Sequence, residues 1–274
     1  MPQGLCALCH QEKELQKSHY IPAGLYARTG EPSLPNPNPV IISKGVMLQT
    51  SDQLWAHLLC AECEELFNKN GEDWVLARVP QAYNAPFPLR EALRPEEPIA
   101  IGDGFNVYAG ASIKSFDMDR IVYFGMSIFW RGAVCEWKDR AGATAPPVAL
   151  CGYEEPVRRF LRGDAFPKDM FLEVFLCAYE QVWPSMWLPD EAHLPERQRY
   201  WFYMAGLIYI LNFGAGTPGI TRRRCAYNST KRIVMIDTIV SENVRTKMSK
   251  KMKESRPVKK FADFLSGPDP RKKK

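Results

Sequence analysis

The sequence of 274 residues contains no long uninterrupted apolar stretch. Its longest apolar run, residues 201–211, is interrupted by Gly206 and falls well short of the roughly 20 residues that a helix needs to cross a bilayer. The chain starts with Met-Pro-Gln-Gly and reaches Cys6 without the apolar segment that a secretory signal requires. We therefore expect no transmembrane segment and a cytosolic location.

The sequence also lacks a phosphate-binding loop and internal repeats. The Gly-rich stretch GAGTPGITRRR, residues 214–224, is not followed by the Gly-Lys-Ser/Thr step that opens a phosphate-binding helix, so we interpret it as a plain turn. The aromatic residues of the later segments are expected to pack into a core rather than to line a cofactor pocket: Phe124, Phe129, Trp130, Phe171 and Phe175. No organic cofactor is predicted.

The chain has no net positive charge outside its C-terminal end. The formal net charge is +5, but residues 245–274 hold 12 Lys and Arg against 3 Asp and Glu, a net charge of +9 that leaves −4 for residues 1–244. With 46% hydrophobic and 24% charged residues, the composition is otherwise that of an ordinary globular protein. The basic character therefore belongs to the tail and not to the body.

Eight cysteines are present, and in a reducing cytosol close pairs favour metal binding over disulfides. Cys6/Cys9 and Cys60/Cys63 are both Cys-x2-Cys pairs, the second at the start of a predicted helix whose N-terminus favours thiolate charge. We predict that these four bind a structural zinc ion, which as a closed four-thiolate site performs no chemistry itself. The remaining cysteines are predicted to be buried thiols without a chemical role: Cys135, Cys151, Cys177 and Cys225.

Shifts in composition and the positions of Pro and Gly predict an α+β protein with four parts. These are a zinc domain at residues 1–79, a Pro-rich linker at 80–98, an α+β domain at 99–240 that is largely helical and ends in a β-hairpin, and a basic helix or tail at 241–274. The five prolines of the linker argue against a regular helix or a central strand there.

Within these parts, residues 40–50 predict a hairpin turning at Lys44-Gly45, and residues 60–79 a helix that breaks near Asn70-Gly71. Residues 117–140, in which Arg131 interrupts an apolar run, predict a buried helix, and 153–164 and 167–183 predict further helices. Residues 199–214 and 223–237 are rich in aromatic and β-branched residues, and we expect them to form paired strands.

The stretches SHYIP, residues 18–22, and LLCAEC, residues 58–63, carry a resemblance to a known family. They resemble the treble-clef branch of the HNH endonuclease superfamily, in which Asp-His-Ile-x-Pro precedes Asn-Leu-x-x-Leu-Cys-x-x-Cys at a helix start. They are also similar to uncharacterised bacterial proteins with Ser-His-x-Ile-Pro, an Asn-Pro-Asn-Pro loop and a Leu-Leu-Cys-x-x-Cys-Glu helix. The resemblance covers about the first 79 residues and implies a ββα-metal-like zinc domain that acts on nucleic acid.

The resemblance implies that His19 is a general base that deprotonates water for attack on phosphorus, near a bound divalent cation such as Mg²⁺, Mn²⁺ or Ni²⁺. Two family positions differ here: Ser18 replaces the metal-binding Asp, and Trp55 replaces the orienting Asn. Asn68 would be the helix ligand of the cation, with Glu64 or Glu72 as the missing carboxylate.

Other readings of these residues stay open. His19 can instead be a structural histidine that hydrogen-bonds the loop, or a zinc ligand in place of one cysteine. His10 and His57 are interpreted as solvent-facing groups or as groups behind the zinc ligands, and Glu64, Glu65 and Glu72 are by default a solvated helix face.

Residues 241–255 predict a basic helix with Ser241 as its N-cap and an apolar stripe of Val244, Met248 and Met252. We expect the stripe to dock on the body and present lysines to nucleic-acid phosphates: Lys250, Lys251 and Lys253. A solvated tail and an anionic membrane surface are the alternatives, and the stripe is too narrow to favour a membrane.

Two functions follow from this sequence. The first is an HNH-like, metal-dependent endonuclease with divergent active-site residues, and the second is a non-catalytic zinc-stabilised module that binds nucleic acid or a protein partner.

Overall fold

A computed structural model describes residues 1–29, 38, 40–43, 46–82, 85–138, 144–182, 185–192, 197–227 and 231–257. Three features expected from the sequence lie outside these residues: the Pro-rich loop at 31–39 apart from Asn38, the Lys44-Gly45 turn, and the chain after residue 257.

The N-terminal module is a small sheet followed by a helix. Its strands, in the order β1-β2-β5, are β1 (Gln3–Leu5), β2 (Glu12–His19) and β5 (Trp55–Cys60), and all pair antiparallel. A tight knuckle joins β1 to β2, and β5 runs directly into helix α2 (Ala61–Phe67). The short helix α1 (Ala23–Tyr26) follows the end of β2. The order of knuckle, hairpin strands and helix positions both cysteine pairs.

Helix α2 does not stop at Asn70-Gly71. It continues through a single π-helical turn, η1 (Asn68–Glu72), into helix α3 (Asp73–Leu76). Gly71 brings this turn against the next long helix, because a Cβ at that position would lie 3.0 Å from the backbone nitrogen of Phe124. The predicted break is thus a π-bulge, a feature that often marks functional sites.

A hairpin extends from this module between β2 and β5. Strands β3 (Val40–Ser43) and β4 (Val46–Gln49) pair antiparallel, which confirms the hairpin predicted at residues 40–50. The last described strand, β13 (Arg256–Pro257), adds to β4 in parallel, so the sheet order is β13-β4-β3. Residues 40–49 and the last described residues, far apart in the sequence, therefore share one small sheet.

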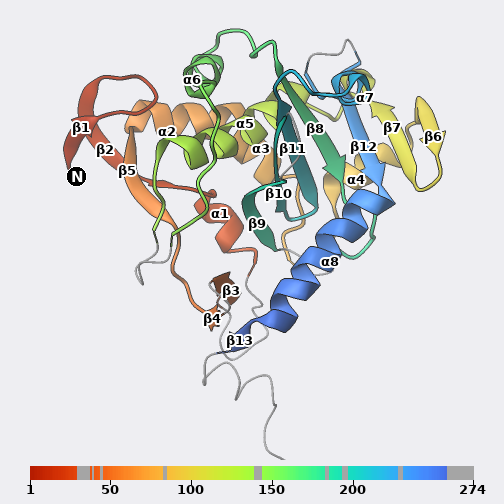
Figure 1. The fold of residues 1–274 in the computed structure, drawn as a ribbon, viewed down its shortest axis with the longest axis horizontal. Coiled ribbons are helices and arrows are strands. Elements are labelled where there is room, and N and C mark those ends of the chain that lie inside the picture. The colour runs from red at the N-terminus through yellow and green to blue at the C-terminus, as the bar shows by residue number, and fades with distance from the viewer. Residues whose placement is uncertain are drawn as a thin grey trace, which may run out of the picture.

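A mixed sheet of seven strands forms the centre of the molecule, and the α+β class predicted from the sequence is confirmed (Figure 1). In spatial order its strands are β6 (Ala100–Gly102), β7 (Phe105–Ala109), β12 (Ile233–Asp237), β8 (Met170–Leu176), β11 (Leu207–Phe213), β10 (Gln198–Met204) and β9 (Met186–Glu191).

Two predictions for these strands were wrong. Residues 167–183 were predicted as a helix but contain the central strand β8, all seven residues of which are buried. A strand covered on both faces has a continuous apolar sequence, which cannot be distinguished from a buried helix by periodicity. Residues 199–214 and 223–237 do not pair with each other: β10 and β11 form one hairpin around Ala205-Gly206, and β12 pairs with β7 and β8.

Helices cover both faces of the sheet (Figure 1). Helix α5 (Met118–Val134) packs on one face, where Phe129 contacts Phe202 with ring centroids 4.9 Å apart. Helix α8 (Thr238–Glu254) crosses the other face, where the Lys247 ammonium lies 4.5 Å from the Trp201 ring centroid. The remaining helices are α4 (Pro88–Leu93), the 3-10 turn η2 (Gly110–Ser112), α6 (Glu154–Leu161) and α7 (Gly219–Arg223).

Helix α4 lies within the Pro-rich stretch 80–98, where no regular helix was predicted. The helix is possible because Pro88 occupies its first position, where a proline loses no internal hydrogen bond. Leu89 and Leu93 of this helix are 1% and 2% exposed, and they belong to one hydrophobic cluster that joins the N-terminal module to the large sheet.

Among the described residues no helix combines the length and the apolar character needed to cross a membrane. Of the four isolated cysteines, Cys177 and Cys225 are buried as predicted, Cys135 is half-buried and Cys151 is exposed. Cys151 was wrongly predicted because it adopts a positive φ of 51° in a surface turn, which its apolar neighbours in the sequence do not reveal.

Candidate functional site

The four paired cysteines converge on one point. The Sγ atoms of Cys6, Cys9, Cys60 and Cys63 all lie within 4.8 Å of one another, and those of Cys9 and Cys60 are 3.9 Å apart. Sulfurs that share a tetrahedral zinc at about 2.3 Å are separated by about 3.8 Å. The cysteines are therefore positioned to bind a metal ion, and four thiolates are a typical ligand set of structural zinc.

The surroundings of these sulfurs fit a bound cation. Burial would raise the pKa of Cys6, but the backbone amides of Cys9, Cys60 and Leu8 lower it to about 7. Burial raises the pKa of Cys60 to about 11 and raises that of Cys63 further. Four ionised thiols in this buried cluster would repel one another, so a divalent cation is needed to hold them as thiolates.

Helix α6 supports the knuckle from outside. The guanidinium of Arg158 donates a hydrogen bond of 2.5 Å from Nη1 to the backbone oxygen of Leu8, and Arg158 is held in turn by Glu155. His10 and His57 flank the cysteines in the sequence, and both are exposed.

His19 is the last residue of β2 and pairs with Trp55, the first residue of β5. Its imidazole is half-buried. Burial, together with the charges of Lys17 and Arg131, lowers the pKa of His19, and Glu72 opposes this shift. The imidazole is therefore neutral at pH 7 and able to accept a proton.

The two charges that act on His19 from outside β2 form a buried ion pair. The Glu72 carboxylate accepts a 2.5 Å hydrogen bond from Nη2 of Arg131, and the two residues are 7% and 1% exposed. Glu72 comes from the π-turn of the N-terminal module, and Arg131 from α5. The guanidinium also lies over the Phe67 ring, 4.7 Å from its centroid. The long helix thus places a cation against the zinc module.

A chain of contacts connects this pair back to His19. Tyr20, the next residue after His19, stacks on Trp137 with ring centroids 5.1 Å apart, and the Trp137 indole donates a 2.8 Å hydrogen bond to the backbone oxygen of Arg131. A Cβ on Gly132 would overlap the Tyr20 hydroxyl, so this approach needs glycine. The Tyr20 hydroxyl and the Nε and Nη1 atoms of Arg131 are buried and find no hydrogen-bond partner among the described residues.

The other predicted site residues are distributed differently. Ser18 is fully buried, and its hydroxyl accepts a 3.1 Å hydrogen bond from the Leu59 amide, so it has a structural role. Asn68 is exposed. Glu64 is half-buried, and one of its carboxylate oxygens is buried with no hydrogen-bond partner in the described part of the chain. Among the described residues, only the four cysteines form a group of three or more His, Cys, Asp or Glu side chains that could hold a metal ion.

Sequence reasoning missed Arg131. The signal was present as an arginine within the apolar run of the helix, unlike Arg120 in its exposed first turn, since a fully buried arginine is almost always paired. The identity of its partner was not visible, because Glu72 is 59 residues away in the sequence.

The three lysines predicted to bind nucleic acid lie in the last turns of α8. Lys250 and Lys253 are exposed and Lys251 is half-buried. The helix starts at Thr238 with Asp237 as its N-cap, not Ser241. Val244 and Met248 are buried as expected for the docking stripe, whereas Met252 is 45% exposed.

Comparison of the chain with protein-family models, with curated proteins and with solved structures gives no match.

Proposed function

We propose that this protein hydrolyses phosphodiester bonds of nucleic acid, with His19 as the general base and Zn²⁺ as the metal held by the four cysteines. The observation that supports the proposal is the position of His19: a neutral, half-buried imidazole at the end of β2 in the metal-binding module, whose pKa responds to the charges of Glu72 and Arg131. This arrangement agrees with the HNH resemblance of residues 18–22 and 58–63.

In this proposal His19 takes a proton from water while the water attacks phosphorus. A divalent cation such as Mg²⁺ would neutralise charge on the phosphate when bound. Mg²⁺ keeps several waters and is commonly bound through one or two carboxylates, so Glu64 and Glu72 would be the residues to hold it, since Ser18 is engaged by the Leu59 amide. Arg131 fixes Glu72, so the carboxylate is held in place before a substrate binds.

A non-catalytic binding module is the second candidate, favoured by two specific observations. Ser18 is buried, and its hydroxyl accepts a hydrogen bond from the Leu59 amide. The charge of Glu72 is already neutralised by Arg131. In that case the zinc module would hold a surface for nucleic acid or protein, and His19 would serve only to fix the end of β2.

Cleavage assays separate the two functions. Wild type and His19→Ala would be compared on plasmid and single-stranded DNA with Mg²⁺, Mn²⁺, Ni²⁺ or EDTA, after zinc content and folding are verified. The hydrolase predicts cation-dependent cutting that the variant loses at unchanged zinc content. A folded, zinc-loaded wild type that cuts neither substrate under any of these conditions contradicts the hydrolase and leaves the binding module.

A further inference from the structure

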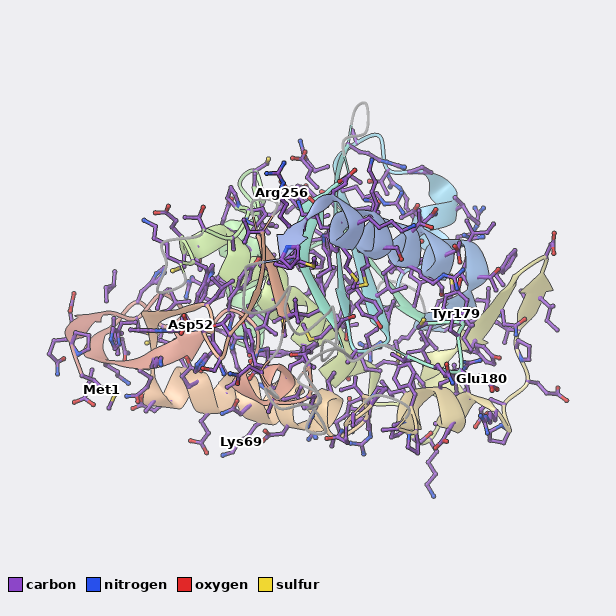
Figure 2. The ribbon with its side chains drawn as sticks, turned by 90° about the horizontal axis from the view of Figure 1, so that it is seen from below. Met1, Asp52, Lys69, Tyr179, Glu180 and Arg256 are labelled. Carbon is purple, nitrogen blue, oxygen red and sulfur yellow. The ribbon has the colours of Figure 1, made fainter. Side chains whose placement is uncertain are left out.

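The end of α8 returns to the module that carries His19. Strand β13 pairs in parallel with β4, with Arg256 opposite Val46. Strand β4 leads through residues 50–54 into β5, whose first residue, Trp55, pairs with His19. Figure 2 shows Arg256 at the end of α8 remote from Tyr179. The last turn of α8 is thus joined to the His19 region through the β3–β4 hairpin.

Four cations gather where α8 meets this hairpin, and we call them the basic end of α8: Lys250, Lys251, Lys253 and Arg256. Glu254 is the one acidic residue among positions 245–257, against six Lys and Arg, which gives this segment a net charge of +5. Its contact with Lys250 is long, at 3.8 Å, and both side chains are largely exposed. For Lys251, Lys253 and Arg256, no ion pair occurs within the described part of the chain.

These cations are held in place and do not lie on a loose tail. Val244 and Met248 of α8 are 7% and 8% exposed against the large sheet. The Ser241 hydroxyl accepts a 2.9 Å hydrogen bond from the Ala178 amide and donates one of 2.6 Å to the Asp237 oxygen. The helix is therefore fixed at its middle and start, and β13 fixes its end.

Charge and dimensions both favour a nucleic-acid backbone as the partner. Residues 1–244 carry a net charge of −4, so a polyanion is repelled by most of the chain and attracted to its C-terminal end. At about 1.5 Å per residue, helical positions 250 to 254 extend over about 6 Å, which corresponds to about two phosphates of one strand at about 3.4 Å each, and Arg256 lies two residues beyond in β13.

We propose that the basic end of α8, with the β3–β4 hairpin beside it, forms the surface that holds the phosphate backbone of nucleic acid next to His19. This inference rests on the proposed function and adds to it the place where the substrate binds. The β3–β4 hairpin and the end of α8 both contribute to the surface, and the binding step is independent of the cleavage step.

The test measures binding in the His19→Ala background, so that cleavage does not interfere. Binding of labelled duplex and single-stranded DNA is followed by fluorescence anisotropy over a salt series for Lys250→Gln/Lys253→Gln. The matched control is Lys114→Gln/Lys168→Gln, which removes the same charge at two exposed loop positions. A second pair of variants tests the hairpin. Val46→Glu places a negative charge on β4, and Ile99→Glu is its control, because Val46 and Ile99 are similarly exposed, at 42% and 45%.

We expect Lys250→Gln/Lys253→Gln to lose roughly 60-fold in duplex affinity at about 0.1 M salt and to reduce the salt slope by about 2, because each lost phosphate contact removes about 0.9 from the slope. The loop control keeps the parent affinity, and only Val46→Glu of the second pair weakens binding. The proposal would be overturned if both lysine double variants lost the same affinity, or if the folded protein did not bind DNA. It would also be overturned if the lysines were needed only for binding to phosphatidylserine vesicles. If DNA binding depends on the lysines but wild type does not cleave DNA, the proposed hydrolase function is contradicted and the proposed binding surface is retained.

Discussion

Glu72 and Arg131 are the residues on which the candidate site depends most directly, because both charges are buried, at 7% and 1% exposure. A buried ion pair gains little net stability over an apolar pair, but removal of one partner leaves an uncompensated charge. The main effect of the pair is therefore on specificity: it fixes how the N-terminal module packs against α5.

We predict that Arg131→Met costs about 3–5 kcal/mol of unfolding free energy, and that the double variant Arg131→Met/Glu72→Gln costs less than the sum of the two single variants. Chemical denaturation checks both values. Arg159→Met is the matched control, since its ion pair with Asp164 is 64% and 47% exposed and is expected to contribute under about 1 kcal/mol. Additive single effects would mean that the pair is not coupled.

His19 predicts a specific pH dependence. Because its pKa is lowered in the folded protein, the unfolded chain binds a proton more readily below pH 6.5. The stability contributed by the neutral imidazole is thus complete above pH 6.5 and is lost as the pH falls towards the folded pKa. In His19→Gln, the unfolding free energy should fall less between pH 7 and about pH 5 than in wild type. Parallel pH profiles of the two proteins would show that His19 is not held neutral.

At the scale of elements, α8 is a surface helix that packs on the hydrophobic core through two buried residues, Val244 and Met248. Met248 is 8% exposed and its sulfur lies 3.8 Å from the Ser185 hydroxyl, whereas Met252, one turn later, is 45% exposed. The Tyr179 hydroxyl donates to Glu242 near the start of the helix. The lysines at the far end are thereby positioned by residues that do not themselves contact a substrate.

Met248→Ala is expected to destabilise the protein by about 2 kcal/mol or more, because it removes buried apolar surface and leaves a cavity. Met252→Ala, the same change one turn along the helix, should stay within about 0.5 kcal/mol. Thermal and chemical denaturation of both variants provide the comparison. Similar losses at the two positions would contradict the observed docking of α8.

At the scale of the whole molecule, the N-terminal module and the large sheet share one hydrophobic cluster. The metal-binding cysteines join β1, β2, β5 and α2, while Arg158 connects the knuckle to α6. Loss of the metal should therefore affect the whole chain and not the module alone.

We predict one mole of zinc per mole of protein, and a decrease in Tm of roughly 10 °C or more when Cys63→Ser removes a ligand. Unfolding should remain a single cooperative transition in both proteins, because the core is continuous. Elemental analysis and calorimetry measure these quantities. Two separate transitions, of which only the first depends on zinc, would instead mean that the module folds as an independent domain.

The metal centre and several elements were predictable from the sequence, because they depend on local spacing. Two Cys-x2-Cys pairs indicated the four clustered cysteines. Apolar residues on nearly all sides indicated α5, and Pro and acidic residues near its start indicated α6. Strand β8 was misassigned because burial on both faces removes the alternation by which a strand is recognised.

The partners of the site residues were decided by tertiary structure alone. Ser18 accepts a hydrogen bond from the Leu59 amide, 41 residues away, and Glu72 pairs with Arg131, 59 residues away. Strand β13, after the end of α8, pairs with β4 more than 200 residues away. Local sequence contains no information on such contacts, because they form only when the sheet, the π-turn and the long helix are packed together. The sequence determined which groups can bind a metal or accept a proton, and the packing decided which of them meet.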